Sequence, residues 1–510
     1  MKKICLINPP YNIAQEAEEQ IEHIGVAYIA GYLEEKGTAV DLYDCPYQAI
    51  SMEDLLTVLK NEKYDVVGIS TYFYNYMSVK RIIRYIKKNT PSTFVFVGGY
   101  LPTLSPERLS VDKKQIDCMV LGEGEITTYE LLHAVMNEQN WHDIRGVCYF
   151  DKNEIVFNAP RDLVCHLDEL PFPKRIEKDK KIYTVITSRG CYGHCNFCGI
   201  KEFYQRNSNY ITRNRTAQNV IAEVETLIAT CSSLREIRFN DDNFALASEI
   251  NQKWFKEFVD LIQERKINLK YTCLLRANDI CKSKEQLAIF KDIGLRMVFI
   301  GIESFVQKDL DFYNKKVKVE ENIRALQICD ELNIRYQIGF MMFNPETTLD
   351  SIICNIECLE KIGYNKKHKY YNKPISNSVV IVTEGAPLEE YVLNAGLRQN
   401  NSIGYGFRDE KVEKCYQIIS QWYSHVDSLS VFSKLEERYE KQNRINQLHK
   451  IRNIFFDLFY YDLCVLKKIA ANLLETTEVE KFKYDFSEDI KYIKTIYKRL
   501  KEIENTDEME

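Results

Sequence analysis

Residues 188–200 read Ser-Arg-Gly-Cys191-Tyr-Gly-His-Cys195-Asn-Phe-Cys198-Gly-Ile, a Cys-x3-Cys-x2-Cys arrangement. Three thiolates held within eight residues suit one iron–sulfur cluster. They leave a four-iron cluster one protein ligand short, so the open iron can bind and activate a small molecule. The spacing therefore indicates catalysis more than plain electron transfer. A zinc knuckle is the alternative, but it needs a fourth ligand, for which His194 is the nearby candidate.

The cysteines follow the first strand of a repeated strand–helix pattern. Helices of ten or more residues separate most of six predicted strands, at 182–188, 234–239, 270–275, 297–302, 335–341 and 377–382. This alternation predicts a partial parallel (β/α)6 barrel over residues 181–395. A loop at a strand end can wrap a cluster, and Gly190, Gly193 and Gly199 allow close backbone approach there.

Residues 1–140 also alternate strands and helices. The predicted strands, at 3–8, 39–43, 65–70, 94–97 and 117–121, are near-continuous apolar runs, as expected when helices cover both faces of a sheet. Helices are predicted at 19–36, 52–61, 78–88 and 127–137. The pattern predicts a doubly wound parallel sheet with its ligand site at the carboxyl ends of the strands. The loops there hold Asn8-Pro9-Pro10-Tyr11, Ser70-Thr71-Tyr72, Gly98-Gly99-Tyr100 and Gly122-Glu123-Gly124.

Two further segments differ in character. Residues 141–180 contain a predicted hairpin and the proline-fixed run Leu167-Asp-Glu-Leu-Pro-Phe-Pro173, which is typical of a linker. Residues 396–510 show helical periodicity and almost no Gly or Pro after Gly406. We therefore expect a helical C-terminal extension, and we expect it to cover the barrel mouth. The whole chain is predicted to be of the α/β class.

Composition limits the possible partners and location. The chain has 510 residues, is 45% hydrophobic and carries a net charge of −6 with no long basic block, so nucleic acid is not expected as a partner. No apolar run reaches the about 18 residues that span a bilayer, so no membrane association is expected. The first residues are typical of a strand, not of a signal peptide. Sixteen cysteines without an export signal indicate a reducing cytoplasm.

The cysteine motif after a first barrel strand resembles that of the radical S-adenosylmethionine superfamily. Phe197 matches the aromatic residue of the family's pattern. The resemblance implies that Cys191, Cys195 and Cys198 ligate a 4Fe-4S cluster whose open iron is chelated by S-adenosylmethionine. It also implies reductive cleavage of that cofactor to a 5′-deoxyadenosyl radical. A flavodoxin or ferredoxin is the expected external electron donor.

Later strand ends match the family one position at a time. The resemblance implies that Asp242 and Asn243, after the second barrel strand, bind the methionyl amino group, although the usual Gly-Gly-Glu form is absent. It implies that Arg276 binds the methionyl carboxylate and that Glu303 reaches the ribose. Gln337, on the fifth strand, is then placed near the adenine.

The N-terminal region resembles the cobalamin-binding domain fused to many such enzymes. The likeness covers about residues 1–390 and includes Ile7-Asn-Pro-Pro10, Gly25-Val-Ala-Tyr-Ile-Ala-Gly31, Val97-Gly98-Gly99, Gly122-Glu-Gly-Glu125, the linker and Phe239-Asn-Asp-Asp-Asn-Phe244. It implies that the nucleotide tail of cobalamin enters beside the sheet at four residues, Ser70, Thr71, Gly98 and Gly99. The aromatic run Tyr72-Phe-Tyr-Asn-Tyr76 could flank the macrocycle or pack between domains.

One cobalamin pattern is missing. The carrier form has Asp-x-His-x-x-Gly after the first strand, where this chain reads Pro9-Pro-Tyr-Asn-Ile-Ala14. His23 lies later, outside that context, and we expect it to be a solvent-facing helix residue. A domain that has lost cobalamin is therefore the alternative to one that binds it.

The resemblance implies an enzyme that transfers a methyl group to an unactivated carbon of a natural product or peptide. Cyclisation or rearrangement with the same cofactors is one alternative. A methylthiotransferase, with a second cluster on Cys5, Cys45 and Cys118, is another. A non-enzymatic corrinoid or iron–sulfur sensor is the alternative from a different class.

Overall fold

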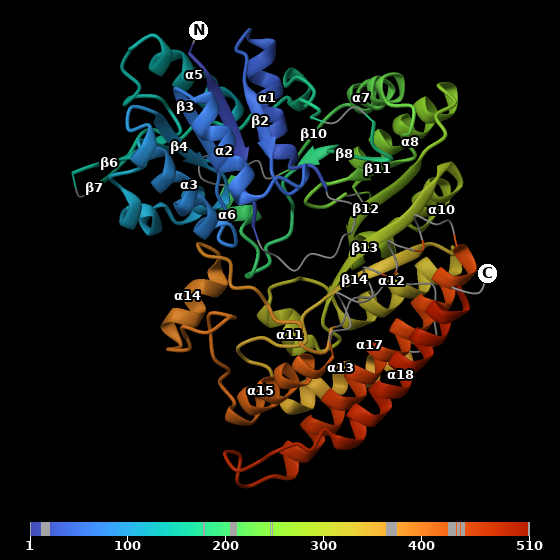
Figure 1. The fold of residues 1–510 in the computed structure, drawn as a ribbon. Coiled ribbons are helices and arrows are strands. Elements are labelled where there is room, and N and C mark those ends of the chain that lie inside the picture. Colours follow the sequence, from blue (N-terminus) through green and yellow to red (C-terminus); the bar gives the residue numbers. More distant parts are fainter. Residues whose placement is uncertain are drawn as a thin grey trace.

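The computed structural model describes residues 2–11, 21–152, 154–176, 179–204, 212–244, 246, 248–363, 375–426, 435, 439 and 444–507. Two parallel sheets follow one another along the chain, and long helices complete it (Figure 1). The predicted α/β class is confirmed, with a doubly wound sheet ahead of a barrel-like sheet and helices at the C-terminal end.

The N-terminal sheet has the strand order β2-β1-β3-β4-β5-β6-β7. Its parallel strands are β1 (Ile4–Asn8), β2 (Asp41–Asp44), β3 (Val66–Ser70), β4 (Phe94–Gly98) and β5 (Cys118–Val120). The order reverses between β1 and β3, which is where open sheets of this kind bind their ligands. The hairpin β6 (Val147–Asp151) and β7 (Glu154–Phe157) adds antiparallel to β5, so the hairpin of the expected linker extends this sheet.

Alternation along each strand explains why these strands are apolar throughout. In β1, Cys5 and Ile7 enter the core beneath α2 (Met52–Glu62) and α3 (Tyr76–Asn89). Ile4 and Leu6 enter the opposite core, beneath α1 (Ile24–Glu35) and α5 (Glu125–Met136). Both faces of the sheet are therefore covered, as the sequence predicts. Short helices α4 (Tyr100–Leu104) and η1 (Pro106–Asp112) follow β4.

The second sheet has the order β14-β13-β12-β11-β8, and all its strands are parallel. The strands are β8 (Ile182–Val185), β11 (Glu236–Phe239), β12 (Lys270–Arg276), β13 (Leu295–Glu303) and β14 (Arg335–Phe340). The predicted sixth strand is reduced, in the described residues, to one parallel bridge between Phe343 and Val379. After Val382 the chain leaves the sheet and contacts the cysteine loop through Leu388. A small ribbon pairs β9 (Ser188–Arg189) with β10 (Arg213–Asn214).

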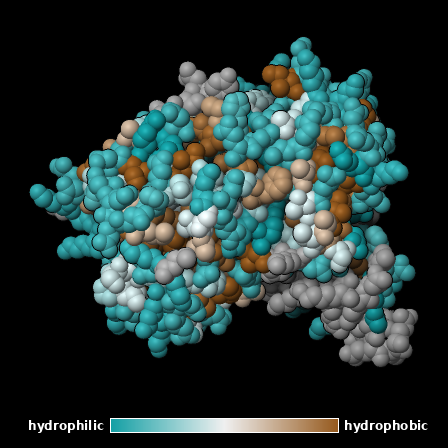
Figure 2. All heavy atoms as spheres, turned by 90° about the horizontal axis from the view of Figure 1, so that it is seen from above, coloured by the Kyte–Doolittle hydropathy of each residue, from teal (hydrophilic) through white to brown (hydrophobic). Residues whose placement is uncertain are grey.

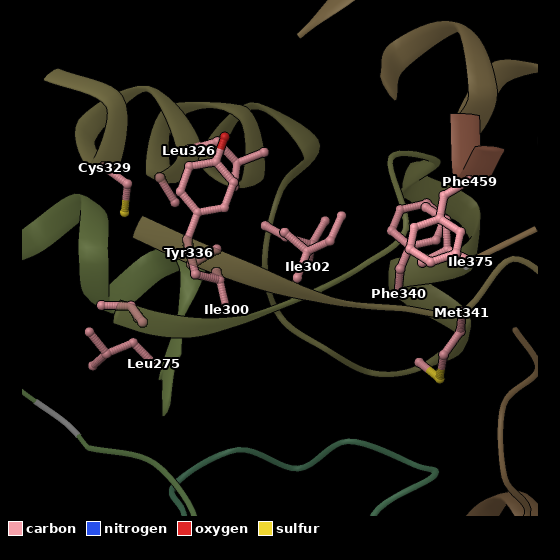
Figure 3. Packing of buried hydrophobic residues seen from close by; sticks show 14 of the residues in the cluster. Leu275, Ile300, Ile302, Leu326, Cys329, Tyr336, Phe340, Met341, Ile375 and Phe459 are labelled. Atoms are coloured by element: carbon pink, nitrogen blue, oxygen red, sulfur yellow. The ribbon is translucent and has the colours of Figure 1, made fainter. Parts of the chain in front are cut away.

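Helices cover the outer face of this sheet. The covering helices are α7 (Ala217–Thr230), α8 (Glu249–Glu264), α10 (Lys284–Ile293), α12 (Val319–Glu331) and α13 (Leu349–Lys361). The short helices α9 (Ala277–Lys282) and α11 (Gln307–Phe312) follow β12 and β13, and α6 (Ile200–Tyr204) follows the cysteine loop and contacts α4. Figure 3 shows Leu326 of α12 with Tyr336 of β14, and Phe459 with Phe340, all members of one buried cluster. The barrel and the C-terminal helices thus share a single hydrophobic core.

The C-terminal helices are α14 (Pro387–Asn394), α15 (Glu410–His425), α17 (Ile445–Glu475) and α18 (Ser487–Asp507). In α17, Lys467 pairs with Glu360 of α13 at 3.0 Å, and α17 packs along α13 on the outside of the barrel (Figure 1). Thus α17 does not cover the barrel mouth, and a cover formed by the rest of the C-terminal extension stays a prediction. Periodicity marks a helix's apolar face, whereas the partner of that face depends on the tertiary fold.

The surface gives no sign of a membrane segment. The face seen in Figure 2 is largely hydrophilic, with hydrophobic residues in scattered groups. Within the described ranges, no helix is long and apolar enough to span a bilayer.

A buried carboxyl group makes the stability of the C-terminal helices depend on pH. Asp462 of α17 is fully buried and accepts a 2.7 Å hydrogen bond from Trp422 Nε1 of α15. Burial raises its pKa to about 7. The folded chain therefore binds this proton more tightly than the unfolded chain, and stability falls as pH rises from the unfolded pKa of about 4 to about 7.

We predict that Asp462→Asn is more stable than the parent above pH 7, by on the order of 2–4 kcal/mol, because the amide stays neutral. The difference should shrink on acidification to pH 4. Urea unfolding followed by tryptophan fluorescence at several pH values measures it. A stability difference that does not change with pH would contradict the assignment.

Candidate active site between the two sheets

The carboxyl edges of the two sheets face each other. Glu123 and Glu125 follow β5 at the carboxyl edge of the N-terminal sheet, and Arg189 follows β8 at the corresponding edge of the second sheet. Hydrogen bonds of 2.8 Å to Glu123 and 2.6 Å to Glu125 join the Arg189 guanidinium to both carboxylates. Since each edge is where its kind of sheet binds ligands, two ligand sites are brought together.

Four buried charges form this junction, which we call the interdomain clamp: Glu123, Glu125, Arg189 and Arg213. Arg213 donates to the second oxygen of Glu123 at 2.8 Å, and the clamp side chains are 10% exposed or less. Burial opposes the ionisation of Glu123, but Arg189 and Arg213 outweigh it and hold its pKa below the ordinary value. Arg189 precedes the first cysteine by two residues and Arg213 lies on β10, so the clamp holds both ends of the segment that contains the cysteine loop.

The cysteine loop is also held from the barrel side. Asn196, between the second and third cysteines, donates to the carbonyl of Phe312 at 2.9 Å, and its backbone binds Tyr313 and Leu388 at 2.9 Å each. Asn314 donates to the carbonyl of His194 at 2.7 Å. Through Leu388 the start of α14 therefore contacts this loop.

Cys191, Cys195 and Cys198 lie together in this loop, half-buried. Burial raises the pKa of Cys191, and burial with the neighbouring thiols raises the pKa of Cys198 to about 12. Among the described residues, no three His, Cys, Asp or Glu side chains are gathered to hold a single metal ion. In an iron–sulfur cluster each cysteine binds a separate iron, so the three thiols fit a cluster better than a single metal ion. The thiols must lose their protons on binding it.

Two aspartates after β11 lie next to the loop. Asp242 accepts a 2.8 Å hydrogen bond from the backbone of Gly190, and burial raises its pKa. Burial and then the charge of Asp242 raise the pKa of Tyr100, which places Asp242 close to the N-terminal domain as well. Asp241, which the sequence did not single out, accepts bonds from Thr187 and Ser188 and ties β11 to β8. Burial raises its pKa to about 6.

Asn243 and Arg276 are joined to each other and to the protein. Asn243 donates to Asp279 at 2.8 Å and accepts from the backbone of Arg276 at 3.2 Å, so both ends of its amide are occupied. The Arg276 guanidinium lies beneath the cysteine loop, 3.5 Å from Cys195 Sγ. Their predicted contacts with S-adenosylmethionine stay predictions, and Asn243 here supports the arginine.

Glu303 and Gln337 lie on the adjacent strands β13 and β14 of the second sheet. Glu303 has φ 66°, a conformation that costs about 1–3 kcal/mol in a residue other than glycine and is typical of functional sites. Its carboxylate binds Lys315 Nζ at 2.8 Å and occupies the space that a Cβ at Gly301 would need. Gln337, on β14, is half-buried and lies opposite Phe299 of β13. The carboxylate thus folds back over the strand backbones at the barrel's carboxyl end.

The four predicted tail-binding residues lie on adjacent strands. Ser70 and Gly98 end β3 and β4 in register, and Thr71 N donates to Gly98 O at 2.7 Å. Gly99 has φ 103°, and a Cβ there would lie 3.1 Å from Thr71 O, so glycine is required at this turn. The Thr71 hydroxyl donates to the carbonyl of Ile69, whereas the Ser70 hydroxyl lies 3.2 Å from His23 Nε2.

His23 does not face solvent, and that expectation is wrong. Its ring is half-buried at the start of α1, where Nδ1 accepts from the backbone of Val26 at 3.3 Å and Nε2 meets Ser70. Burial lowers its pKa, so the neutral form is favoured. Its backbone donates to Asp44 at the end of β2, which also accepts from Asn8 at the end of β1. The sequence could not show this position, because the partners Asp44 and Ser70 are distant from His23 in sequence. Of the loop that lacks the Asp-x-His-x-x-Gly pattern, residues 12–14 lie outside the described ranges.

A cobalamin-sized ligand finds suitable groups at the β1–β3 reversal. Asn8 is 3% exposed, and its Oδ1 has no hydrogen-bond partner among the described residues. A buried acceptor of this kind costs stability unless a donor reaches it. Together with Ser70 and the glycine turn, it fits the amide donors that cobalamin carries.

Aromatic rings connect the two edges. Tyr72 stacks on Tyr100 at 5.5 Å, and Tyr100 stacks on Phe203 of α6 at 4.7 Å. Tyr72 also meets the His23 ring at 5.6 Å. The aromatic run therefore packs between the domains, as one of its two interpretations predicts. A cavity of about 280 Å³ opens beside this row and is lined by Glu123, Phe203 and Tyr204 among others, but none of the predicted site residues lines it.

The three cysteines proposed for a second cluster do not meet. Cys5 and Cys45 are buried in the core under α2 and α3, whereas Cys118 is buried in the core on the opposite face of the sheet. Burial raises the pKa of Cys118. These positions do not support the methylthiotransferase alternative.

Two family models match the chain at the regions just described. The B12 binding domain matches residues 13–132, and the Radical SAM superfamily matches residues 185–353. The chain is 27% identical to an uncharacterized methyltransferase of Pyrococcus horikoshii over 374 residues, which is 71% of this chain and 78% of that relative.

Solved structures share the fold. The cobalamin-dependent S-adenosylmethionine radical enzyme OxsB, with aqua-cobalamin and S-adenosylmethionine bound, matches at a TM-score of 0.73 and 18% identity, covering 100% of this chain and 80% of that one. The radical S-adenosylmethionine methyltransferase TsrM from Kitasatospora setae, with cobalamin and a [4Fe-4S] cluster bound, matches at 0.61 and 17% identity, covering 78% of this chain and 76% of that one.

We predict that Glu123→Gln destabilises the chain by about 3–5 kcal/mol, because it leaves buried arginines without their carboxylate. Glu53→Gln is the matched control, since Glu53 pairs with Arg81 at 2.8 Å on an exposed surface and its loss should change stability little. Urea unfolding followed by circular dichroism compares the two. Equal losses would show that the clamp does not stabilise the domain junction.

Proposed function

This chain belongs to the radical S-adenosylmethionine enzymes that carry a cobalamin-binding domain, and we propose that it methylates an unactivated carbon of a natural product or peptide. The observation that carries the proposal is the edge-to-edge arrangement of the two sheets, in which the clamp joins the start of the cysteine loop to the carboxyl edge of the N-terminal sheet. Cobalamin, a 4Fe-4S cluster and S-adenosylmethionine are its cofactors. When bound, they supply the radical and the methyl group.

The residues of the chain hold and shield these groups. Cys191, Cys195 and Cys198 would ligate the cluster, and Asn196 with the clamp fixes the loop that carries them. The stacked Tyr72, Tyr100 and Phe203 close the space between the edges to water. Excluding water protects a reactive intermediate from side reactions.

Other positions are proposed for the small ligands. Asp242, which accepts from the backbone of Gly190 at the start of the loop, is assigned to the methionyl amino group, Glu303 to the ribose and Gln337 to the adenine. Four residues are assigned to the cobalamin tail, Ser70, Thr71, Gly98 and Gly99, and we add Asn8 because of its unpartnered oxygen. We propose four parts of the chain: a cobalamin-binding-like domain at 1–140, a linker with the hairpin at 141–180, the radical S-adenosylmethionine barrel at 181–395 and the helical extension at 396–510.

An external one-electron donor, a flavodoxin or ferredoxin, is proposed to reduce the cluster. A cyclisation or rearrangement with the same cofactors is the second candidate outcome, because it would use the same facing edges. Transfer of a deuterated methyl group from S-adenosylmethionine to the product separates the two.

The decisive experiment uses anaerobically reconstituted full-length protein with cobalamin, S-adenosylmethionine and a strong reductant. We expect 5′-deoxyadenosine to accumulate, as the product of reductive cleavage. Protein that carries its cluster and still forms no 5′-deoxyadenosine would contradict a radical enzyme, and would favour the sensor alternative.

We predict that Cys195→Ala abolishes cluster binding, so that the iron content falls from about four per chain to near zero. Cys354→Ala is the control, because Cys354 is exposed on α13, far from the loop in sequence, and should retain the iron. Iron analysis and absorption near the cluster's charge-transfer bands measure both. Iron retained in Cys195→Ala would exclude this cysteine as a ligand.

A further inference from the structure

We propose that Arg276 is a positioning residue of the cluster, raising its reduction potential through a hydrogen bond to Cys195. The inference rests on the proposed function, since it requires a cluster on the cysteine loop. It differs from the role predicted from the family resemblance, in which Arg276 binds the carboxylate of S-adenosylmethionine.

Arg276 reaches the loop from the end of β12. Its side chain is 5% exposed overall, and Nη1 lies 3.5 Å from Cys195 Sγ, within hydrogen-bond distance for sulfur. A Cβ atom at Gly193 would lie 2.5 Å from the same Nη1. The glycine at this position of the motif therefore leaves room for the guanidinium beneath the loop.

The guanidinium is locked in this orientation. Nη2 donates to the carbonyl of Lys315, and the plane lies 5.3 Å from the centre of the Tyr192 ring. Tyr192 is itself fixed, because its hydroxyl donates to Asp279 at 2.6 Å and accepts from Asn278 at 3.0 Å. Asn243 holds the backbone of Arg276.

The contacts with protein atoms use two of the five N–H donors of the guanidinium. Nε is buried without a partner among the described residues. A carboxylate bound to both terminal nitrogens would compete with Cys195 and the Lys315 carbonyl, whereas the Nε hydrogen stays available to it. The contact of Nη1 with Cys195 Sγ is the one that assigns the arginine to the thiolate.

The charge of Arg276 has a direct consequence for a bound cluster. Reduction adds one negative charge, and a guanidinium stays protonated at all working pH values. A fixed cation with an N–H···S hydrogen bond stabilises the more negative state, and hydrogen bonds to the sulfurs are a known determinant of cluster potential. Arg276 therefore makes the cluster easier to reduce, which eases electron transfer from the external donor.

The test is a redox titration of the reconstituted protein without S-adenosylmethionine, following the electron paramagnetic resonance signal of the reduced cluster. We expect Arg276→Gln and Arg276→Met to shift the midpoint potential to more negative values. Arg276→Lys keeps the charge and should restore most of the parent value. Arg265→Gln is the control, because Arg265 is exposed at the C-terminal end of α8 and its loss should leave the potential near that of the parent.

The outcomes are separable. A parent-like potential in Arg276→Gln, together with weaker binding of S-adenosylmethionine, would overturn the proposal in favour of the carboxylate role. A potential in Arg276→Lys as negative as in Arg276→Gln would also overturn it, because charge would then not be the cause. If Arg276→Met does not hold iron, the midpoint potentials of Arg276→Gln and Arg276→Lys decide between the two roles of the arginine. Parent protein without a cluster signal would instead mean that the proposed function fails.

Discussion

The structure depends on buried charges that join two sheets edge to edge. Arg189 is shared between Glu123 and Glu125, and Arg213 takes the remaining oxygen of Glu123. Charges this deeply buried are tolerated only when they are paired, so the two edges have one satisfactory arrangement. That arrangement fixes the distance and angle between the two proposed cofactor sites, because the arginines belong to the strands that flank the cysteine loop.

Other contacts extend the same constraint in both directions. Asn196 fastens the loop to the barrel, and Arg276 supports it from below. On the opposite side, the row from Tyr72 to Phe203 links the β3 end to the helix that follows the third cysteine. A displacement of either sheet would therefore move groups on both. Rigid support of this kind is what radical chemistry requires, since the reacting groups must meet with little freedom to move.

The sequence predicted much of this framework and missed its long-range parts. Continuous apolar runs located β1 to β5, because covered strands lack a polar face, and the cysteine spacing singled out the loop that we propose binds the cluster. The place of His23 depended on Asp44 and Ser70, which no local pattern connects to it. The sequence analysis noted the acidic residues of Gly122-Glu-Gly-Glu125, but only the fold shows that they form ion pairs with Arg189 and Arg213. The apolar run within 377–382 predicted a strand, yet in the described residues it forms a single bridge with Phe343, and the chain beyond it contacts the cysteine loop through Leu388.

The central claim is that the facing edges hold a corrin and a cluster close together. The electron-spin relaxation time of cob(II)alamin measures this most directly, because a nearby paramagnetic cluster shortens that time. In protein loaded with both groups, we predict that the Co(II) signal relaxes faster when the cluster is reduced than when it is oxidised and diamagnetic. A Co(II) signal whose relaxation is the same in both states of the cluster would contradict the facing arrangement.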